Sequence, residues 1–353
     1  MSQTPSAVAQ RAGPASGLTF PFTEPPATAR WTAITPDLHW VRMPLPFALD
    51  HINLWLLRGP HGWTLVDCGF HSKETRAAWD GLLPQHAPLE QIIVTHYHPD
   101  HIGQGGWMVR EFGVPFHMTE AEYLTAHALY ESTSGYDNEG LQTLYRSHGL
   151  AADKVELLKQ RPTGYRNVIT EPPRTFRRIM HGDSLRLGFH EWRVIAGFGH
   201  SPEHASLYCA ELGLVISGDM LLPKISTNVS VWSTEPEGDP VGQFLRSIRA
   251  YEDLPEDTLV LPSHGLPFRG IGPRVAALHA HHDERLADLV AACATPMTAA
   301  DVVPVLFRRQ LDTHQLFFAM GESIAHLNHL LTRGRVERTK GADGAYRFTA
   351  RPA

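Results

Sequence analysis

The segment VTHYHPDHIGQGG (94–106) constrains the fold of this chain more than any other, because it carries four metal-ligand residue types within six positions. These are His96, His98, Asp100 and His101. They follow the run QIIVT (91–95), whose apolar and β-branched residues predict a buried strand. His96 and His98 are two residues apart, so an extended chain end points both side chains the same way. Imidazole and carboxylate ligands suit zinc, and also iron or manganese. The pattern therefore predicts a metal site at a strand end.

Composition excludes several broad classes of protein. With 42% hydrophobic and 19% charged residues, the 353-residue chain has a globular balance, which excludes disorder of the whole chain. No apolar run approaches the roughly 18 residues of a membrane-spanning helix. A formal charge of -6 argues against a general affinity for nucleic acid or membranes. The N-terminus lacks the pattern of a secretory signal, and the cysteines lie too far apart for a disulfide framework, so we expect a cytoplasmic protein. The cysteines are Cys68, Cys209 and Cys293.

The order of strand-like and helix-like segments predicts three parts. Residues 1–30, rich in Ala, Pro, Ser and Thr, are interpreted as a flexible arm. Residues 31–294 alternate strands and helices, which predicts an α/β layered domain. Within it, residues from about 120 to 165 show helical spacing and are interpreted as an inserted helical cap. Residues 295–353 contain two helical segments followed by a hairpin signal, the outline of a winged helix.

The segment THYHPDH resembles the HxHxDH signature of the metallo-β-lactamase fold. Four further motifs of that superfamily appear in order along the chain, one before this segment and three after it, and the resemblance covers roughly residues 35–290. They are VDCG (66–69), GHSPEH (199–204), SGD (217–219) and PSHG (262–265). The resemblance implies a four-layered αββα sandwich with metals at one edge. Together with the tail, it is similar to a subgroup of the superfamily that carries an associated C-terminal winged helix.

The resemblance also implies roles for individual residues. The first metal would be held by His96, His98 and His200, and the second by Asp100, His101 and His264. Asp219 would bridge the two metals, which is similar to the glyoxalase II and lactonase branches. Asp67 would either support a ligand from behind by a hydrogen bond or only form the turn Asp67-Cys68-Gly69. Apart from the resemblance, His204 is interpreted as a support for a ligand rather than a ligand itself. No residue is assigned to substrate binding.

The ligand set predicts hydrolysis by a metal-activated water. We expect two divalent ions, zinc first, with manganese or iron as alternatives. Asp100 would act in catalysis by holding the attacking hydroxide and passing its proton to the leaving group. The favoured substrate is a small-molecule thioester, ester or lactone whose acyl part lies under the cap. The alternative is a phosphodiesterase or endoribonuclease acting on single-stranded RNA.

The charge and the apolar content of the C-terminal tail both bear on the RNA alternative. Residues 297–353 contain eight Lys or Arg against five Asp or Glu, a net charge of +3 that suits phosphates. The predicted helix over 314–332, however, is rich in apolar residues, which favours packing or a homodimer over nucleic-acid binding. Upstream of the tail, three further histidines are interpreted as a solvated helix face. They are His279, His281 and His282.

Overall fold

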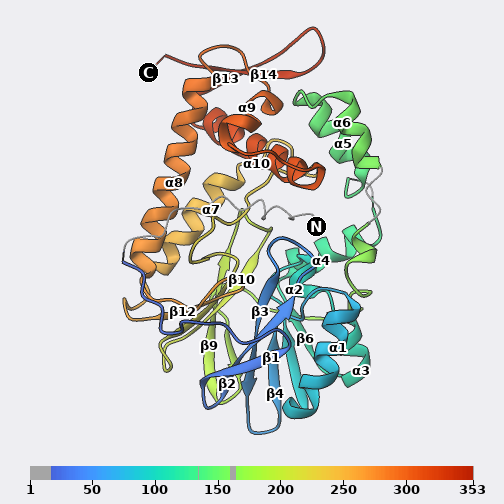
Figure 1. The fold of residues 1–353 in the computed structure, drawn as a ribbon, viewed down its shortest axis with the longest axis vertical. Coiled ribbons are helices and arrows are strands. Elements are labelled where there is room, and N and C mark those ends of the chain that lie inside the picture. The colour runs from blue at the N-terminus through green and yellow to red at the C-terminus, as the bar shows by residue number, and fades with distance from the viewer. Residues whose placement is uncertain (1–16, 134, 160–163, 353) are drawn as a thin grey trace, which may run out of the picture.

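The computed structural model describes residues 17–133, 135–159 and 164–352, and folds them into two stacked sheets with helices on both outer faces (Figure 1). The first sheet has seven strands in chain order: β1 (Arg30–Thr35), β2 (Leu38–Pro44), β3 (His51–Arg58), β4 (Trp63–Val66), β5 (Leu89–Ile93), β6 (Phe116–Met118) and β7 (Arg177–Arg178). The second sheet has the order β12 (Leu259–Pro262), β11 (Leu214–Gly218), β10 (His204–Cys209), β9 (His190–Gly197) and β8 (Ser184–Leu187).

Strand periodicity explains why each sheet is covered on both faces. In β3, Leu54 and Leu56 belong to the core beneath α1 (Lys73–Leu82) and α3 (Gly105–Phe112). The intervening Trp55 belongs to the core between the two sheets. Successive side chains of a strand point to opposite faces, so a strand buried on both faces reads as a continuous apolar run.

The second sheet repeats this arrangement. Leu214 and Ile216 of β11 lie between the sheets, whereas Val215 packs in the outer core with α7 (Pro240–Ile248) and α8 (Ile271–Ala292). The layer order is therefore helices, sheet, sheet, helices. This confirms the predicted αββα sandwich.

The strand directions place the sequence motifs at one edge of the sandwich. β4 and β5 run parallel in the first sheet, and β11 and β12 run parallel in the second. The carboxyl ends of parallel neighbours meet at the same edge. Asp67 follows β4, the segment 95–101 follows β5, Asp219 follows β11 and His264 lies just beyond β12.

The insert between β6 and β7 is helical, and it contains α4 (Glu120–Tyr130), α5 (Asn138–Ser147) and α6 (Ala152–Lys159). Asp137 caps α5 through a hydrogen bond from the amide of Gly140. Tyr123 of α4 stacks on Phe176 and donates its hydroxyl to the carbonyl of Pro173. Through these contacts the insert is fixed to the chain that returns to the sheet.

The last part of the chain has the predicted order of two helices and a hairpin: α9 (Ala299–Leu306), α10 (Thr313–Thr332), β13 (Val336–Lys340) and β14 (Tyr346–Ala350). These elements lie together at one end of the molecule, beside α8 (Figure 1). Side chains 319–330 of α10 are buried, and the helix packs on α7 and α8. The winged-helix assignment of this unit stays a prediction.

The structure also bears on the predicted N-terminal arm and on the three histidines of α8. Of the predicted arm, residues 1–16 lie outside the described residues, whereas Thr19 pairs with Arg269 and Phe22 contacts Trp40. The solvated histidine face on α8 is wrong for His282, which is 1% exposed and stacks on His326 of α10. The error arose because α10 covers that face of α8.

Among the described residues, no helix combines the length and apolar character needed to cross a membrane.

The shared outer core gives a test of how α10 is integrated. Leu327 is fully buried and belongs to the same core as Ile195 and Val215 of the sheet. We expect Leu327→Ala to lower the free energy of unfolding by about 2–5 kcal/mol, because the truncation leaves a cavity. Urea denaturation measures this, with the exposed Thr332→Ala as the control. A change below about 0.5 kcal/mol, typical of surface sites, would show that α10 is not part of the folded core.

Candidate metal centre

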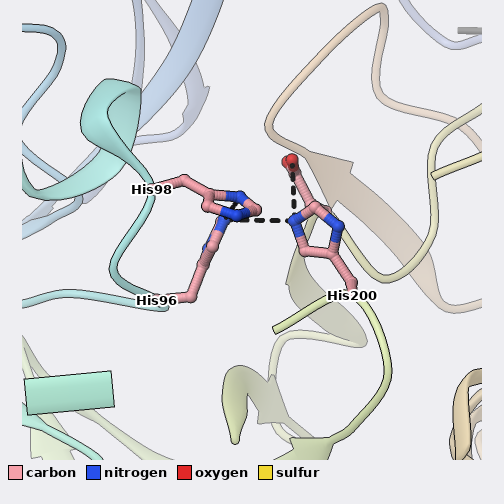
Figure 2. Close-up of side chains that lie close together, drawn as sticks. His96, His98 and His200 are labelled. Atoms are coloured by element: carbon pink, nitrogen blue, oxygen red, sulfur yellow. Dashed lines mark hydrogen bonds and ion pairs between the residues drawn. The ribbon is translucent and has the colours of Figure 1, made fainter. Parts of the chain in front are cut away.

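Three imidazoles and one carboxylate form the first group of ligand atoms at this edge. His96, His98 and His200 point their ring nitrogens toward one another (Figure 2). Nε2 of His96 lies 2.9 Å from Nδ1 of His98 and 3.2 Å from Nε2 of His200. Asp219 completes this group, and its Oδ2 lies 3.4 Å from Nε2 of His200.

Asp100, His101 and His264 form the second group. Oδ2 of Asp100 lies 3.4 Å from Nε2 of His264 and 3.7 Å from Nε2 of His101. Oδ1 of Asp219 lies 3.5 Å from Nε2 of both histidines. Asp219 thus faces both groups with different oxygens. The structure brings together the side chains of all seven residues that the sequence singled out, and their role as metal ligands stays a prediction.

The hydrogen bonds behind the rings decide which nitrogen faces the cluster. Nδ1 of His200 donates to the carbonyl of Asn228, and Nδ1 of His264 donates to the carbonyl of His51, both at 2.8 Å. Nδ1 of His101 donates to Oδ2 of Asp67, also at 2.8 Å. A neutral imidazole that donates through Nδ1 carries its lone pair on Nε2. In their neutral form these rings therefore present acceptor nitrogens to the cluster, as metal ligands must.

Asp67 supports the site from a turn after β4. It has a left-handed backbone with φ of 62°, which Asp tolerates better than most residues. Its Oδ1 accepts the amide of Thr95 at 2.8 Å, and its Oδ2 accepts the hydroxyl of Thr95 at 2.9 Å besides the ring of His101. Asp67 therefore joins the end of β4 to the ligand segment after β5. It is both a turn residue and a support for a ligand.

The charges of the two groups differ. Burial lowers the pKa of His96 well below its usual value and that of His98 to about 3, so both rings are neutral. Burial also acts on His101 and His264, but there the carboxylates prevail. Asp67, Asp100 and Asp219 raise the pKa of His101 well above its usual value, and Asp219 with Asp100 raises that of His264 to about 10. The second group thus strongly favours a positive charge.

Two buried atoms test whether the residues fit a metal ion. Nε2 of His101 and Oδ1 of Asp219 have no hydrogen-bond partner among the described residues. Buried polar atoms are normally paired, and an orphan atom calls for an explanation such as an ion. A divalent cation satisfies both atoms and matches the histidine and carboxylate donor set. The cluster therefore fits a metal ion.

Several residues hold the cluster in place by hydrogen bonds, and the sequence predicted only some of them. His204, expected behind the site, accepts the amide of Asp219 on its Nε2 at 3.2 Å. The side-chain amide of Asn53 donates to the carbonyls of Pro262 and Gly265, which fixes the His264 loop to β3. Sequence reasoning missed Thr95, Glu122 and Asn228. Thr95 could have been found from its place before His96, but no spacing signals the other two.

Comparison with known proteins agrees with this geometry. The family model of the metallo-beta-lactamase superfamily matches residues 48–264, and that of the metallo-beta-lactamase-like C-terminal domain matches residues 286–351. A beta-lactamase domain protein from Burkholderia ambifaria is 42% identical, with a TM-score of 0.89 over 96% of this chain and 99% of that one.

Two curated relatives are more distant. A probable metallo-hydrolase from Bacillus subtilis, YqjP, is 28% identical over 84% of this chain and 92% of its own length. A hydroxyacylglutathione hydrolase from Cereibacter sphaeroides is 27% identical over 50% of this chain and 48% of its own length. The fold, the cluster and these similarities define a metallo-hydrolase. The chain belongs to the metallo-beta-lactamase superfamily, as the resemblance predicted, and carries its C-terminal domain.

The cluster predicts that metal binding stabilises the fold. We expect Zn²⁺ at about 100 times its dissociation constant to add about 2.7 kcal/mol to the free energy of unfolding, because the ligands converge only in the folded chain. Thermal melting with and without Zn²⁺ measures the effect. His98→Ala should lose most of the shift, and the exposed His61→Ala should keep it. An undiminished shift in His98→Ala would show that Zn²⁺ binds elsewhere.

Proposed function

We propose that the chain is a dinuclear zinc hydrolase of the cytoplasm that cleaves a small-molecule thioester, ester or lactone. The observation that carries the proposal is a cavity of about 340 Å³ that begins at His200 and runs under the cap. Its size falls within the range of small-molecule sites. The three buried, unpaired cysteines support the reducing compartment.

The lining of the cavity suits an uncharged acyl group. Aromatic and aliphatic side chains from the cap and from the segments around His200 and Trp232 form much of the wall: Tyr97, Leu129, Tyr136, Leu141, Phe198, Val231 and Trp232. No Lys or Arg is among the described residues that line it. A phosphate or an anionic acyl chain would meet no Lys or Arg among these described lining residues, whereas an apolar chain would bury its surface.

The cluster supports hydrolysis without a nucleophilic side chain. The chemistry that divalent ions would supply when held by this cluster is a hydroxide at neutral pH and stabilisation of the charge on the carbonyl oxygen. His96, His98, His200 and Asp219 would hold one ion, and Asp100, His101 and His264 the other, with Asp219 reaching both. Asp100 has the most exposed carboxylate of the cluster, at 20% of its side chain. It is therefore the residue placed to take a proton from water and return it to the leaving group.

The cation distribution weighs against the RNA alternative. Among the cationic residues of the tail, Arg308 pairs with Asp288, Arg338 with Glu237 and Arg347 with Asp343. Pairing reduces the positive potential that a phosphate backbone would meet. The relative whose name assigns it hydroxyacylglutathione, a thioester, also favours an acyl substrate.

The function is tested by thiol release from a panel of acyl-CoA and acyl-glutathione thioesters. We expect the zinc- or manganese-loaded protein to release thiol and Asp219→Ala to be inactive, because Asp219 faces both ligand groups. Circular dichroism should show that the variant keeps its fold. Full activity in Asp219→Ala would refute the metal-site interpretation. If a protein shown to hold two metals releases no thiol, the ester, lactone and single-stranded RNA assays follow.

The cavity predicts selectivity for acyl length. Leu129 and Leu124 lie on the same helix, but Leu129 lines the cavity, whereas Leu124 is 57% exposed and lies outside it. We expect Leu129→Trp to lower kcat/KM for the best long-chain thioester by about tenfold or more and to change acetyl thioesters little, because the indole fills space that only a long chain occupies. Leu124→Trp should match the wild type. Equal losses for short and long chains in Leu129→Trp would contradict the assignment of the cavity.

A further inference from the structure

Glu122, in the first turn of the cap helix α4, is fully buried and accepts three hydrogen bonds. Its Oε2 accepts the amide of Tyr97 at 3.0 Å. Its Oε1 accepts the hydroxyl of Ser201 at 2.6 Å and the amide of Glu203 at 2.7 Å. The two oxygens of one carboxylate therefore hold two different loops.

These loops carry the imidazoles of the first ligand group. Tyr97 stands between His96 and His98, and Ser201 follows His200 directly. Glu203 precedes His204, which holds the backbone amide of Asp219. A shift of Glu122 would therefore change the spacing between the His96–His98 pair and His200. Ligand atoms that must converge within a few ångströms leave little tolerance for such a shift.

The first turn of α4 is bound to the His200 loop by a second contact. Thr119, at the N-cap position, makes no side-chain cap bond to its own helix. Its hydroxyl donates instead to the carbonyl of Glu203 at 2.7 Å. Glu203 thus gives its amide to Glu122 and receives a bond on its carbonyl from Thr119. Three hydrogen bonds therefore join the start of α4 to this loop.

The energetics favour a role in positioning over a role in packing. Burying a carboxylate is costly, and no Lys or Arg pairs with Glu122 among the described residues. Its three donors and the positive end of α4 compensate for part of that cost. An apolar residue could anchor the helix without the cost, but it could not hold backbone amides from two loops. What the carboxylate adds is fixed geometry.

We propose that Glu122 is a positioning residue of the metal centre, which sets the spacing between the His96–His98 loop and the His200 loop. Helix α4 then supports the metal site through its first turn and lines the cavity further along, at Thr125 and Leu129. The inference rests on the proposed metal binding. It assigns Glu122 no contact with substrate or metal.

The test uses Co²⁺ as the probe with Glu122→Gln and the matched control Glu120→Gln. Glu120 lies in the same turn, but its carboxylate is at the surface and pairs with Arg178. Glutamine keeps the size of the side chain but replaces one acceptor oxygen with an NH₂ group that meets a donor. We expect Glu122→Gln to lower Co²⁺ affinity by about tenfold or more and to change the visible absorption bands of the bound ion. Glu120→Gln should match the wild type in both.

If Glu122→Gln fails to fold, Ser201→Ala provides the test. It removes one donor and leaves the carboxylate and both amide bonds, so we expect a smaller loss of Co²⁺ affinity in the same direction. Wild-type affinity and absorption in a folded Glu122→Gln, or in Ser201→Ala when Glu122→Gln is unfolded, would overturn the proposal. Failure of the wild type itself to bind Co²⁺ would instead refute the metal site.

Discussion

The site depends on the convergence of buried polar side chains at an edge shared by two sheets. Such groups are stable in the interior only when each has a partner. At this edge the partners are themselves built into the fold: a carboxylate after β4 for His101, and backbone carbonyls for His200 and His264. The positions of these side chains are therefore consequences of strand pairing and turn geometry, and the hydrogen bonds behind the rings orient the imidazoles.

Contacts between the sheets hold this edge together. The amide of Asn53 in β3 donates to the carbonyl of Ser263, and the amide of Ala205 in β10 donates to the carbonyl of Thr95. Each bond joins a residue of one sheet to a loop or strand of the other. The two sheets contribute different ligands, so their relative position determines the cluster geometry. These cross-sheet bonds fix the relative position of the sheets directly beside His96 and His264.

The sequence predicted which side chains gather at this edge, because each of them stands in a short motif. His96, His98, Asp100 and His101 fall within six positions, and the other ligands stand in short motifs after strands. Strand and helix patterns predicted only an α/β layered domain, whereas the αββα layer order came from the resemblance carried by the five motifs. Glu122 and Asn228 could not be predicted, because their partners lie 25–94 residues away in the chain and the contacts arise only from tertiary packing. The burial of His282 was missed for the same reason, since α10 supplies the covering surface.

The packing of α10 also links the C-terminal unit to the catalytic edge. The amide of Val231, a residue of the cavity wall, donates to the carbonyl of Gly321 in α10. Asn228, whose carbonyl orients His200, donates its side-chain amide to Glu322 at 3.3 Å. Tyr145 of the cap donates its hydroxyl to the carbonyl of Phe317. Helix α10 therefore contacts the cap, the cavity wall and Asn228, whose carbonyl binds His200. These contacts indicate that the tail packs on the main domain, whereas its net charge alone would suggest phosphate binding.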